Sequence, residues 1–169
     1  MRERIKHRLQ ANRRLRRRSG RQQDAHDAQS VANYIIQQPR GFTPLKVMKL
    51  LYFCHAWVLA LTGNPLIRQD FKVWRYGPVV PDVYHELKRY GNGTVTEPIE
   101  SHETAYLTER EKDIVDSVLR QYGDKSAWRL SALTHLPDSP WDQTRMKRGE
   151  GVSIPNYLIQ EYYYKRRKV

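Results

Sequence analysis

The amino-acid sequence predicts a mainly α protein, in which a compact helical domain is built around one buried central helix and carries a small β element and a basic N-terminal extension. Three observations support this fold class. Residues 45–61 are apolar at 14 of 17 positions, helix caps recur along the chain, and one stretch of aromatic residues, glycine and proline interrupts the helical pattern. The length of 169 residues suits a single domain.

The first predicted helix begins at Asp24, a residue type that caps helix N-termini, and ends before Pro39. Four residues at helical spacing form its apolar face: Ala28, Val31, Ala32 and Ile35. The folded part of the chain is therefore expected to begin at Asp24.

The central helix is predicted between Thr43 and Gly63. Thr43 is a good N-cap, Pro44 suits the first helical position, and Gly63 suits the position after the last turn. Because the helix is apolar nearly all round, it is expected in the middle of a bundle. A membrane span needs about 20 apolar residues, so a core helix explains this shorter run better.

The few polar residues of the central helix have predictable positions. Lys46 and Lys49 lie within about 60° of each other on a helical wheel, and His55 lies on the side opposite Lys46. His55 is therefore expected to face protein rather than water. Cys54 is the single cysteine, which excludes an internal disulfide and a cysteine-only zinc site, and we expect it to be a buried, inert thiol.

The β element is predicted at residues 71–76, where side chains alternate in the way that suits a short strand with both faces partly covered. Gly77 and Pro78 are expected to break this strand, and residues 94–96 are candidates to pair with it. The other helices are predicted from caps and stop signals: from Pro81 to Gly91, from a Thr108/Glu111 capping box to Gly123, after Ser126, after Ser139, and over residues 154–164.

The net charge of +12 is concentrated at the two ends. Residues 1–23 hold ten Arg and Lys against one Glu, and residues 165–168 read KRRK, whereas residues 24–164 have a net charge of −1. We predict a basic extension over 1–23, a helical domain over 24–164 and a basic tail over 165–169. A near-neutral domain weakens the hypothesis that its folded face binds nucleic acid.

The basic extension leaves two interpretations open. It is either a solvated tail or an arm that contacts nucleic acid or an acidic protein surface. Contacts of such an arm with nucleic-acid phosphates would not depend on the nucleotide sequence. The residues expected to make such contacts are Arg13, Arg14, Arg16, Arg17 and Arg18. No apolar segment of the kind found in a signal peptide follows the basic start, so we expect a cytoplasmic protein without membrane contact.

Catalytic patterns are missing from the sequence. No HExxH, paired-cysteine, P-loop, GxGxxG or GxSxG pattern occurs, and none of the six histidines lies three or four residues from another. We expect no enzyme, no metal site and no cofactor.

Large aromatic residues near glycine and proline are typical packing anchors at a corner, and His135 lies near a helix end, where it can bind a carbonyl or complete a cap. The aromatic residues concerned are Trp74, Tyr76, Trp128 and Trp141.

Three segments in order carry a family resemblance: KLLYFCHAWVLALTGNPLI, then F-x-VWRYGPVVPDVYHELKRYG, then LSALTHLPDSPW. Over residues 28–142 the chain resembles the Panacea domain family of SocA- and GepA-like proteins from bacteria and phages. It departs from the family pattern at Val73, where alanine is frequent, and in the Arg-rich extension. The residues that match the first motif are Trp74, Tyr76, Gly77, Pro78, Val79, Pro81 and Tyr84. Those that match the second are Ser131, Thr134, His135, Pro140 and Trp141.

This resemblance implies a binding function without enzymatic activity. Panacea proteins resemble antitoxins of two-gene toxin–antitoxin modules, which are thought to neutralise their toxins by direct protein contact. The implied partner is a cognate toxin encoded nearby, and a protease is a further partner if the chain resembles the branch that acts as a proteolytic adaptor. The alternative function is a nucleic-acid-binding regulator that acts through its basic ends.

The stretch WRYGPVVPDVY is interpreted as a structural corner between a strand and a helix. Gly77 allows the backbone to reverse, and the two prolines stiffen it. A stiff corner also lowers the cost of ordering a surface for a partner. Polar residues beside the aromatic ones are therefore candidates for partner binding: Arg75, Asp82 and Glu86.

Overall fold

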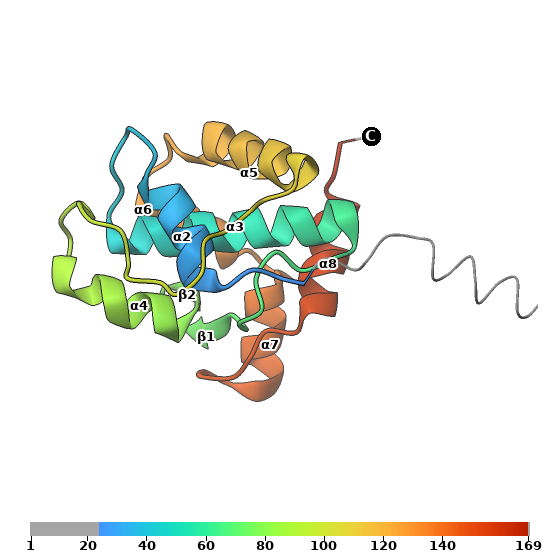
Figure 1. Ribbon diagram of the computed structural model, residues 1–169. Helices are drawn as coiled ribbons and strands as arrows, with labels where there is room; N and C mark the ends of the chain where they lie inside the picture. Colours follow the sequence, from blue (N-terminus) through green and yellow to red (C-terminus); the bar gives the residue numbers. More distant parts are fainter. Residues whose placement is uncertain (1–23, 169) are drawn as a thin grey trace, which may run out of the picture.

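The computed structural model describes residues 24–168, and its helices occur in the order that the caps predict (Figure 1). The predicted extension over 1–23, with its five candidate arginines, and Val169 lie outside the described residues. The elements are α2 (Ala28–Ile36), α3 (Pro44–Thr62), β1 (Lys72–Trp74), β2 (Gly77–Val79), α4 (Pro81–Leu87), the 3-10 helix η1 (Lys88–Tyr90), α5 (Glu109–Tyr122), α6 (Ala127–Thr134), α7 (Pro140–Arg148) and α8 (Asn156–Lys165). The mainly α fold with a small β element is confirmed.

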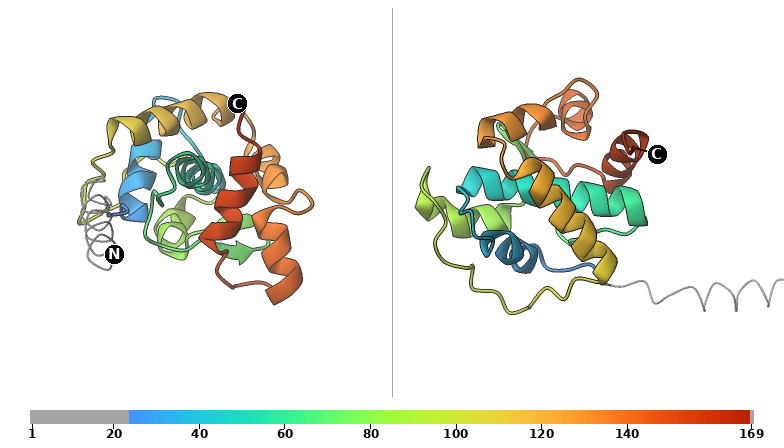
Figure 2. Two further views of the ribbon diagram at one scale, coloured as in Figure 1. Left: turned by 90° about the vertical axis from the view of Figure 1, so that its right-hand side faces the viewer. Right: turned by 90° about the horizontal axis from the view of Figure 1, so that it is seen from above.

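Helix α3 is the centre of the domain, as its apolar sequence predicts. Figure 2 (left) looks down α3 and shows the other elements around it, and the right-hand view shows α5 lying across it. Thr43 accepts a hydrogen bond from the backbone N–H of Lys46, and Gly63 ends the helix at φ 77°. The helix is long and apolar enough to cross a membrane, yet 72% of its most apolar window is buried in the protein. It is a core helix.

The start of α2 differs from the prediction. Asp27, not Asp24, is the N-cap, and its side chain accepts hydrogen bonds from the backbone N–H groups of the first turn. The reason is tertiary pairing: the backbone N–H of His26 donates to Leu66 at 2.8 Å. This extended pairing delays the helix beyond Asp24.

The β element is a hairpin, and here the prediction is wrong in two respects. Gly77 and Pro78 do not end the sheet but form β2, which pairs antiparallel with β1 in the register Val73↔Pro78. Residues 94–96 form no strand; instead the backbone N–H of Val95 donates to Phe42. Gly77, at φ 112°, adopts a conformation that favours glycine and lets the chain return at once.

The segment before α8 adds to the open edge of this hairpin. The backbone N–H of Ile154 donates to Phe71, and that of Val73 donates to Val152. Helix α8 therefore begins at Asn156, two residues later than predicted. It ends at Lys165, the first residue of the predicted basic tail.

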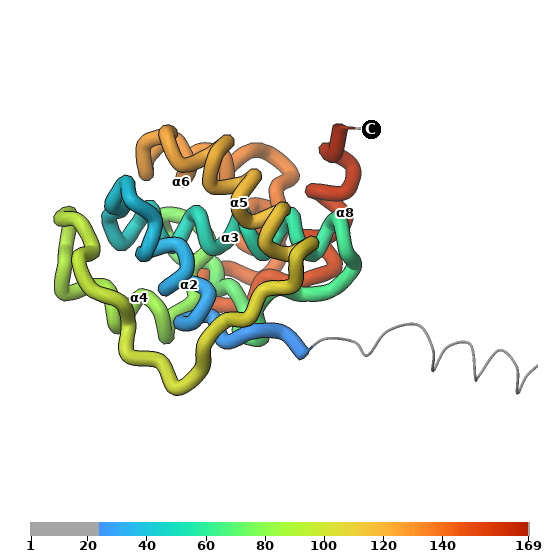
Figure 3. The backbone as a smooth tube through the Cα atoms, turned by 45° about the horizontal axis from the view of Figure 1, so that its top comes forward, coloured from blue at the N-terminus to red at the C-terminus, as the bar shows by residue number. Residues whose placement is uncertain are grey.

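A long connection between η1 and α5 runs along the outside of α2 (Figure 3). The side-chain amide of Asn33 fixes it by two hydrogen bonds to the backbone of Ile99, at 2.8 and 2.7 Å. The predicted capping box then starts α5, because Thr108 and Glu111 exchange both hydrogen bonds. The connection therefore covers the core beside α2.

Candidate functional site

The two sequence motifs meet at the β1–β2 hairpin. Side chains of α6, α7 and the turn between them contact three successive main-chain carbonyls of the hairpin turn. Trp141 Nε1 donates to Trp74 O (2.9 Å) and Ser131 Oγ donates to Tyr76 O (2.5 Å), while the His135 ring lies between two carbonyls, with Nε2 3.1 Å from Arg75 O and Nδ1 2.6 Å from Ser131 O. The second motif therefore holds the backbone of the first.

The turn between α6 and α7 is itself fixed by short-range hydrogen bonds. Thr134 donates to Ser131 O at 2.6 Å, and Ser139 donates to Thr134 O at 2.7 Å while capping α7. The ring centroids of His135 and Trp141 are 3.9 Å apart. These local bonds explain why the motif places small hydroxyl residues beside the donors that reach the hairpin.

Lys49 of α3 supports the hairpin from below, which the sequence prediction missed. Its side chain is fully buried, and its Nζ donates to Pro78 O at 2.8 Å. Burial away from water lowers the pKa of Lys49 from 10.5 to about 7. Lys46, which shares its side of the helical wheel, is only partly buried. What separates the two lysines is the hairpin that covers Lys49.

Gly77 is the point where the motifs and Lys49 come closest. A Cβ atom at this position would lie 2.6 Å from Thr134 Oγ1 and 3.1 Å from Lys49 Nζ. No real Cβ atom approaches an oxygen so closely, so both space and the positive φ require glycine here. The corner interpretation of the motif thus has a specific structural basis.

Above this fixed backbone lies a groove of about 460 Å³, here called the aromatic groove. Two aromatic pairs line it in edge-to-face geometry: Trp74 with Tyr84 (centroids 5.0 Å apart) and Tyr76 with Trp128 (5.4 Å). Its inner side is aliphatic, and its charged lining residues are both basic. The aliphatic residues are Leu45, Met48 and Val79, and the basic ones are Arg75 and Lys88.

The predicted packing anchors divide into two groups. Trp141 is buried, as expected of an anchor, and Trp74 is partly buried. Tyr76 and Trp128, however, are 47% and 64% exposed, so the prediction that they are packing anchors is wrong. They pack against each other at the surface, where nothing in the described chain covers them. The buried residues of α6 are Leu130, Ser131 and Thr134, so Trp128 lies off the buried face of this helix.

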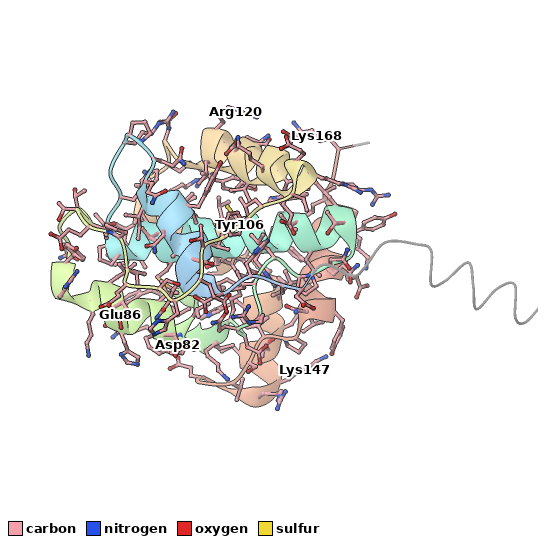
Figure 4. All side chains as sticks on the ribbon, viewed as in Figure 1. Asp82, Glu86, Tyr106, Arg120, Lys147 and Lys168 are labelled. Carbon is pink, nitrogen blue, oxygen red and sulfur yellow. The ribbon has the colours of Figure 1, made fainter. Side chains whose placement is uncertain are left out.

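The three predicted partner-binding residues do not form one site. Arg75 lines the aromatic groove, and its guanidinium lies 5.4 Å from the centroid of the Tyr76 ring. Asp82 and Glu86 lie together on the outer edge of α4 and do not line the groove (Figure 4). Tyr84 of α4 and Lys88, the first residue of η1, do line it. The assignment of all three residues to partner binding stays a prediction.

Burial keeps the side chains of His55 and Cys54 uncharged. Burial lowers the pKa of His55 to about 4, and its Nε2 contacts the side-chain oxygen of Asn156 at 2.9 Å. Burial raises the pKa of the Cys54 thiol far above its usual value, which makes it unreactive, as predicted. Within residues 24–168, no three His, Cys, Asp or Glu side chains gather in a way that could hold a metal ion.

The comparisons with known proteins bear directly on these motifs. Residues 47–142 match the family described as "Antitoxin SocA-like, Panacea domain". The chain is also 33% identical over 141 residues to "Antitoxin SocA" of Caulobacter vibrioides (strain NA1000 / CB15N), an alignment that covers 76% of this chain and 74% of that protein. No solved structure matches the chain. The matched range contains most of α3, the hairpin, Ser131, His135 and Trp141, and the chain belongs to the family of SocA-like antitoxins with a Panacea domain.

Proposed function

We propose that this protein is the antitoxin of a toxin–antitoxin module and neutralises its toxin by direct protein–protein contact. Membership of the SocA-like antitoxin family supports the antitoxin role and makes a cognate toxin the expected partner. Direct contact is the finer step, and the aromatic groove supports it. The proposed activity is binding, without a chemical reaction.

The exposed aromatic residues of the groove carry this proposal. The few residues that carry most of the binding energy at protein interfaces are enriched in tryptophan, tyrosine and arginine, and Trp128, Tyr76 and Arg75 are side by side here. The backbone that carries Tyr76 and Arg75 is held in place, because the main-chain carbonyls of Trp74 and Tyr76 accept hydrogen bonds from Trp141 and Ser131 and the His135 ring packs against that of Arg75. A surface fixed in advance loses little conformational entropy on binding.

Co-expression tests the proposal most directly. The chain is produced together with the product of its neighbouring gene, and growth and co-purification are scored in the same cells. We expect the neighbour alone to stop growth, and the pair to grow and yield a stable complex. The double variant Tyr76→Ala/Trp128→Ala should lose both rescue and complex. Tyr157→Ala, which removes an equally exposed tyrosine on α8 outside the groove, should keep both.

The other outcomes contradict direct neutralisation in different ways. Rescue without a complex would indicate repression or another indirect route, and would move the alternative, nucleic-acid binding through the basic ends, to the front. That alternative predicts an affinity for nucleic acid that falls steeply with salt. If the product of the neighbouring gene does not stop growth when it is produced alone, it is not a toxin, and the toxin–antitoxin assignment loses its main support.

The described part of the basic tail gives this alternative little support. Lys165 pairs with Glu161 at 2.6 Å, and the guanidinium groups of Arg166 and Arg167 lie 3.4 Å from the ring centroids of Tyr162 and Tyr164. Three of its four cations therefore contact α8. Lys168 and Lys147 lie at different edges of the domain (Figure 4).

A further inference from the structure

We propose that the aromatic groove binds an amphipathic peptide segment of the toxin in which apolar anchor residues are flanked by a carboxylate. This inference rests on the proposed antitoxin function and names the chemistry of the segment that the antitoxin recognises. It follows from three features of the groove: its apolar lining, its charge and its fixed geometry.

The apolar lining of the groove favours apolar side chains of a partner protein as the ligand. The aliphatic residues Leu45, Met48 and Val79 form the inner side, and the aromatic pairs form the walls. A volume of about 460 Å³ is enough for a few apolar side chains, but not for a folded domain. An amphipathic helix places such side chains one turn apart on a single face, which is how helices dock in apolar grooves.

The charge of the groove determines what flanks these anchors. Arg75 and Lys88 are its charged lining residues, and neither forms an ion pair with another residue in the range 24–168. Four aromatic rings would otherwise suit a cationic ligand. The two basic side chains beside the rings repel such a ligand and attract a carboxylate, so a partner segment with acidic residues complements the groove.

The same features disfavour a nucleic-acid strand as the occupant. Single-stranded nucleic acid binds grooves in which many cations follow the phosphate backbone and open aromatic faces receive bases. Here two cations line the groove, its inner side is aliphatic, and the edge-to-face pairs direct aromatic rings at each other. A protein segment satisfies this surface better.

Peptide selection tests the inference and does not require the toxin to be identified. The full-length chain is immobilised and used to select from a phage-displayed random library of peptides of about 15 residues. We expect enriched sequences to combine two or more Leu, Ile, Phe or Trp residues with a neighbouring Asp or Glu. Synthetic copies should bind about tenfold more weakly to Trp128→Ala than to the original chain, and with unchanged affinity to Tyr157→Ala.

Reversing the charge of Arg75 tests whether a carboxylate of the peptide contacts the basic residues of the groove. Arg75→Glu should weaken the acidic peptides about tenfold and strengthen the same peptides with Lys in place of the acidic residue. Because Trp128 and Arg75 are exposed, we expect both variants to fold, and circular dichroism checks this. If Trp128→Ala does not fold, Tyr76→Leu removes the partner ring of the same pair and replaces it as the test.

Three results of the peptide selection and binding measurements would overturn the inference. They are selection without any enrichment, enriched peptides that bind Trp128→Ala as tightly as the original chain, and enrichment of basic residues instead of acidic ones. Displacement of the peptides by a single-stranded oligouridylate would likewise assign the groove to nucleic acid. Each of these can occur while co-expression still shows a toxin complex, which would leave the proposed function standing and place the toxin elsewhere.

Discussion

Helix α3 and the aromatic groove are both rich in large apolar side chains, yet they place them differently. On α3, Phe53 is 2% exposed and its ring stacks on Tyr122 of α5 with centroids 4.4 Å apart. In the groove, Trp128 is 64% exposed and touches Tyr76, which is itself half exposed. The same kind of residue holds the fold together in one region and is presented to solvent in the other.

The difference shows how the family motif combines stability with an open surface. The motif uses its main-chain carbonyls for hydrogen bonds to α6 and α7, and it leaves the Tyr76 side chain exposed beside Trp128. Stability therefore comes from α3 and from the bonds to the hairpin backbone. The aromatic side chains of the groove are left free to contribute to binding.

The largest expected effect is on the α3 side of the comparison. Phe53→Ala removes a ring that packs against Tyr122 of α5 and Tyr163 of α8, and should lower the free energy of unfolding by about 3–5 kcal/mol. Urea denaturation measures this change. Phe53→Leu, which keeps most of the volume, should cost clearly less; equal losses for the two variants would argue against tight packing around this ring.

Lys49 links the two regions, and its effect depends on pH. Its pKa is about 7 in the folded chain and 10.5 ordinarily, so between these values the unfolded chain binds more protons. Its contribution to stability should therefore rise with pH through this window, by at most about 1.4 kcal/mol per pH unit. Urea denaturation from about pH 7 to pH 10 should show wild-type stability rising relative to Lys49→Met.

A surface lysine serves as the control for this measurement. Lys147 is exposed on α7, and Lys147→Met should leave the pH dependence unchanged. A constant difference between wild type and Lys49→Met at every pH would mean that Lys49 keeps its ordinary pKa and that the amine reaches water in solution.

The fold was predictable from sequence wherever the signal is local. Caps at Thr43, Thr108, Ser126 and Ser139 act within one turn of helix, so residue types alone indicated where those helices begin. The prediction of Asp24 as the N-cap was wrong because Asp24 and Asp27 are both aspartates before the helix, and local sequence does not distinguish them. The choice between them depends on backbone pairing with a segment some forty residues away.

The candidate site was predictable in its residues but not in its geometry. Sequence placed the two motifs and suggested that His135 binds a carbonyl or completes a cap, and its ring nitrogens lie 2.6 Å from Ser131 O and 3.1 Å from Arg75 O. Sequence did not show which carbonyls are bound or that Lys49 lies beneath Gly77. Both depend on contacts between residues far apart in the chain. Burial of Lys49 and exposure of Trp128 both follow from where the hairpin lies, which helical periodicity does not encode.

An intermediate effect is expected for the bonds that hold the hairpin. Trp141→Phe keeps an aromatic ring but removes the N–H that donates to Trp74 O, and should cost about 1–2 kcal/mol. It should also increase hydrogen exchange of the backbone amides in residues 72–79. Trp128→Phe is the matched control, because the indole N–H of Trp128 has no partner among residues 24–168. Equal effects of the two changes would mean that the bond to Trp74 O contributes nothing.

The smallest expected effect on stability accompanies the largest effect on binding. Trp128→Ala loses one edge-to-face contact and little buried area, so it should lower the free energy of unfolding by no more than about 1 kcal/mol. The same change should weaken the toxin complex at least about tenfold, as measured by calorimetry with the purified pair. If Trp128→Ala destabilised the chain as much as Phe53→Ala, the two regions would be one core. The exposed aromatic pair would then have to be explained by folding rather than by recognition.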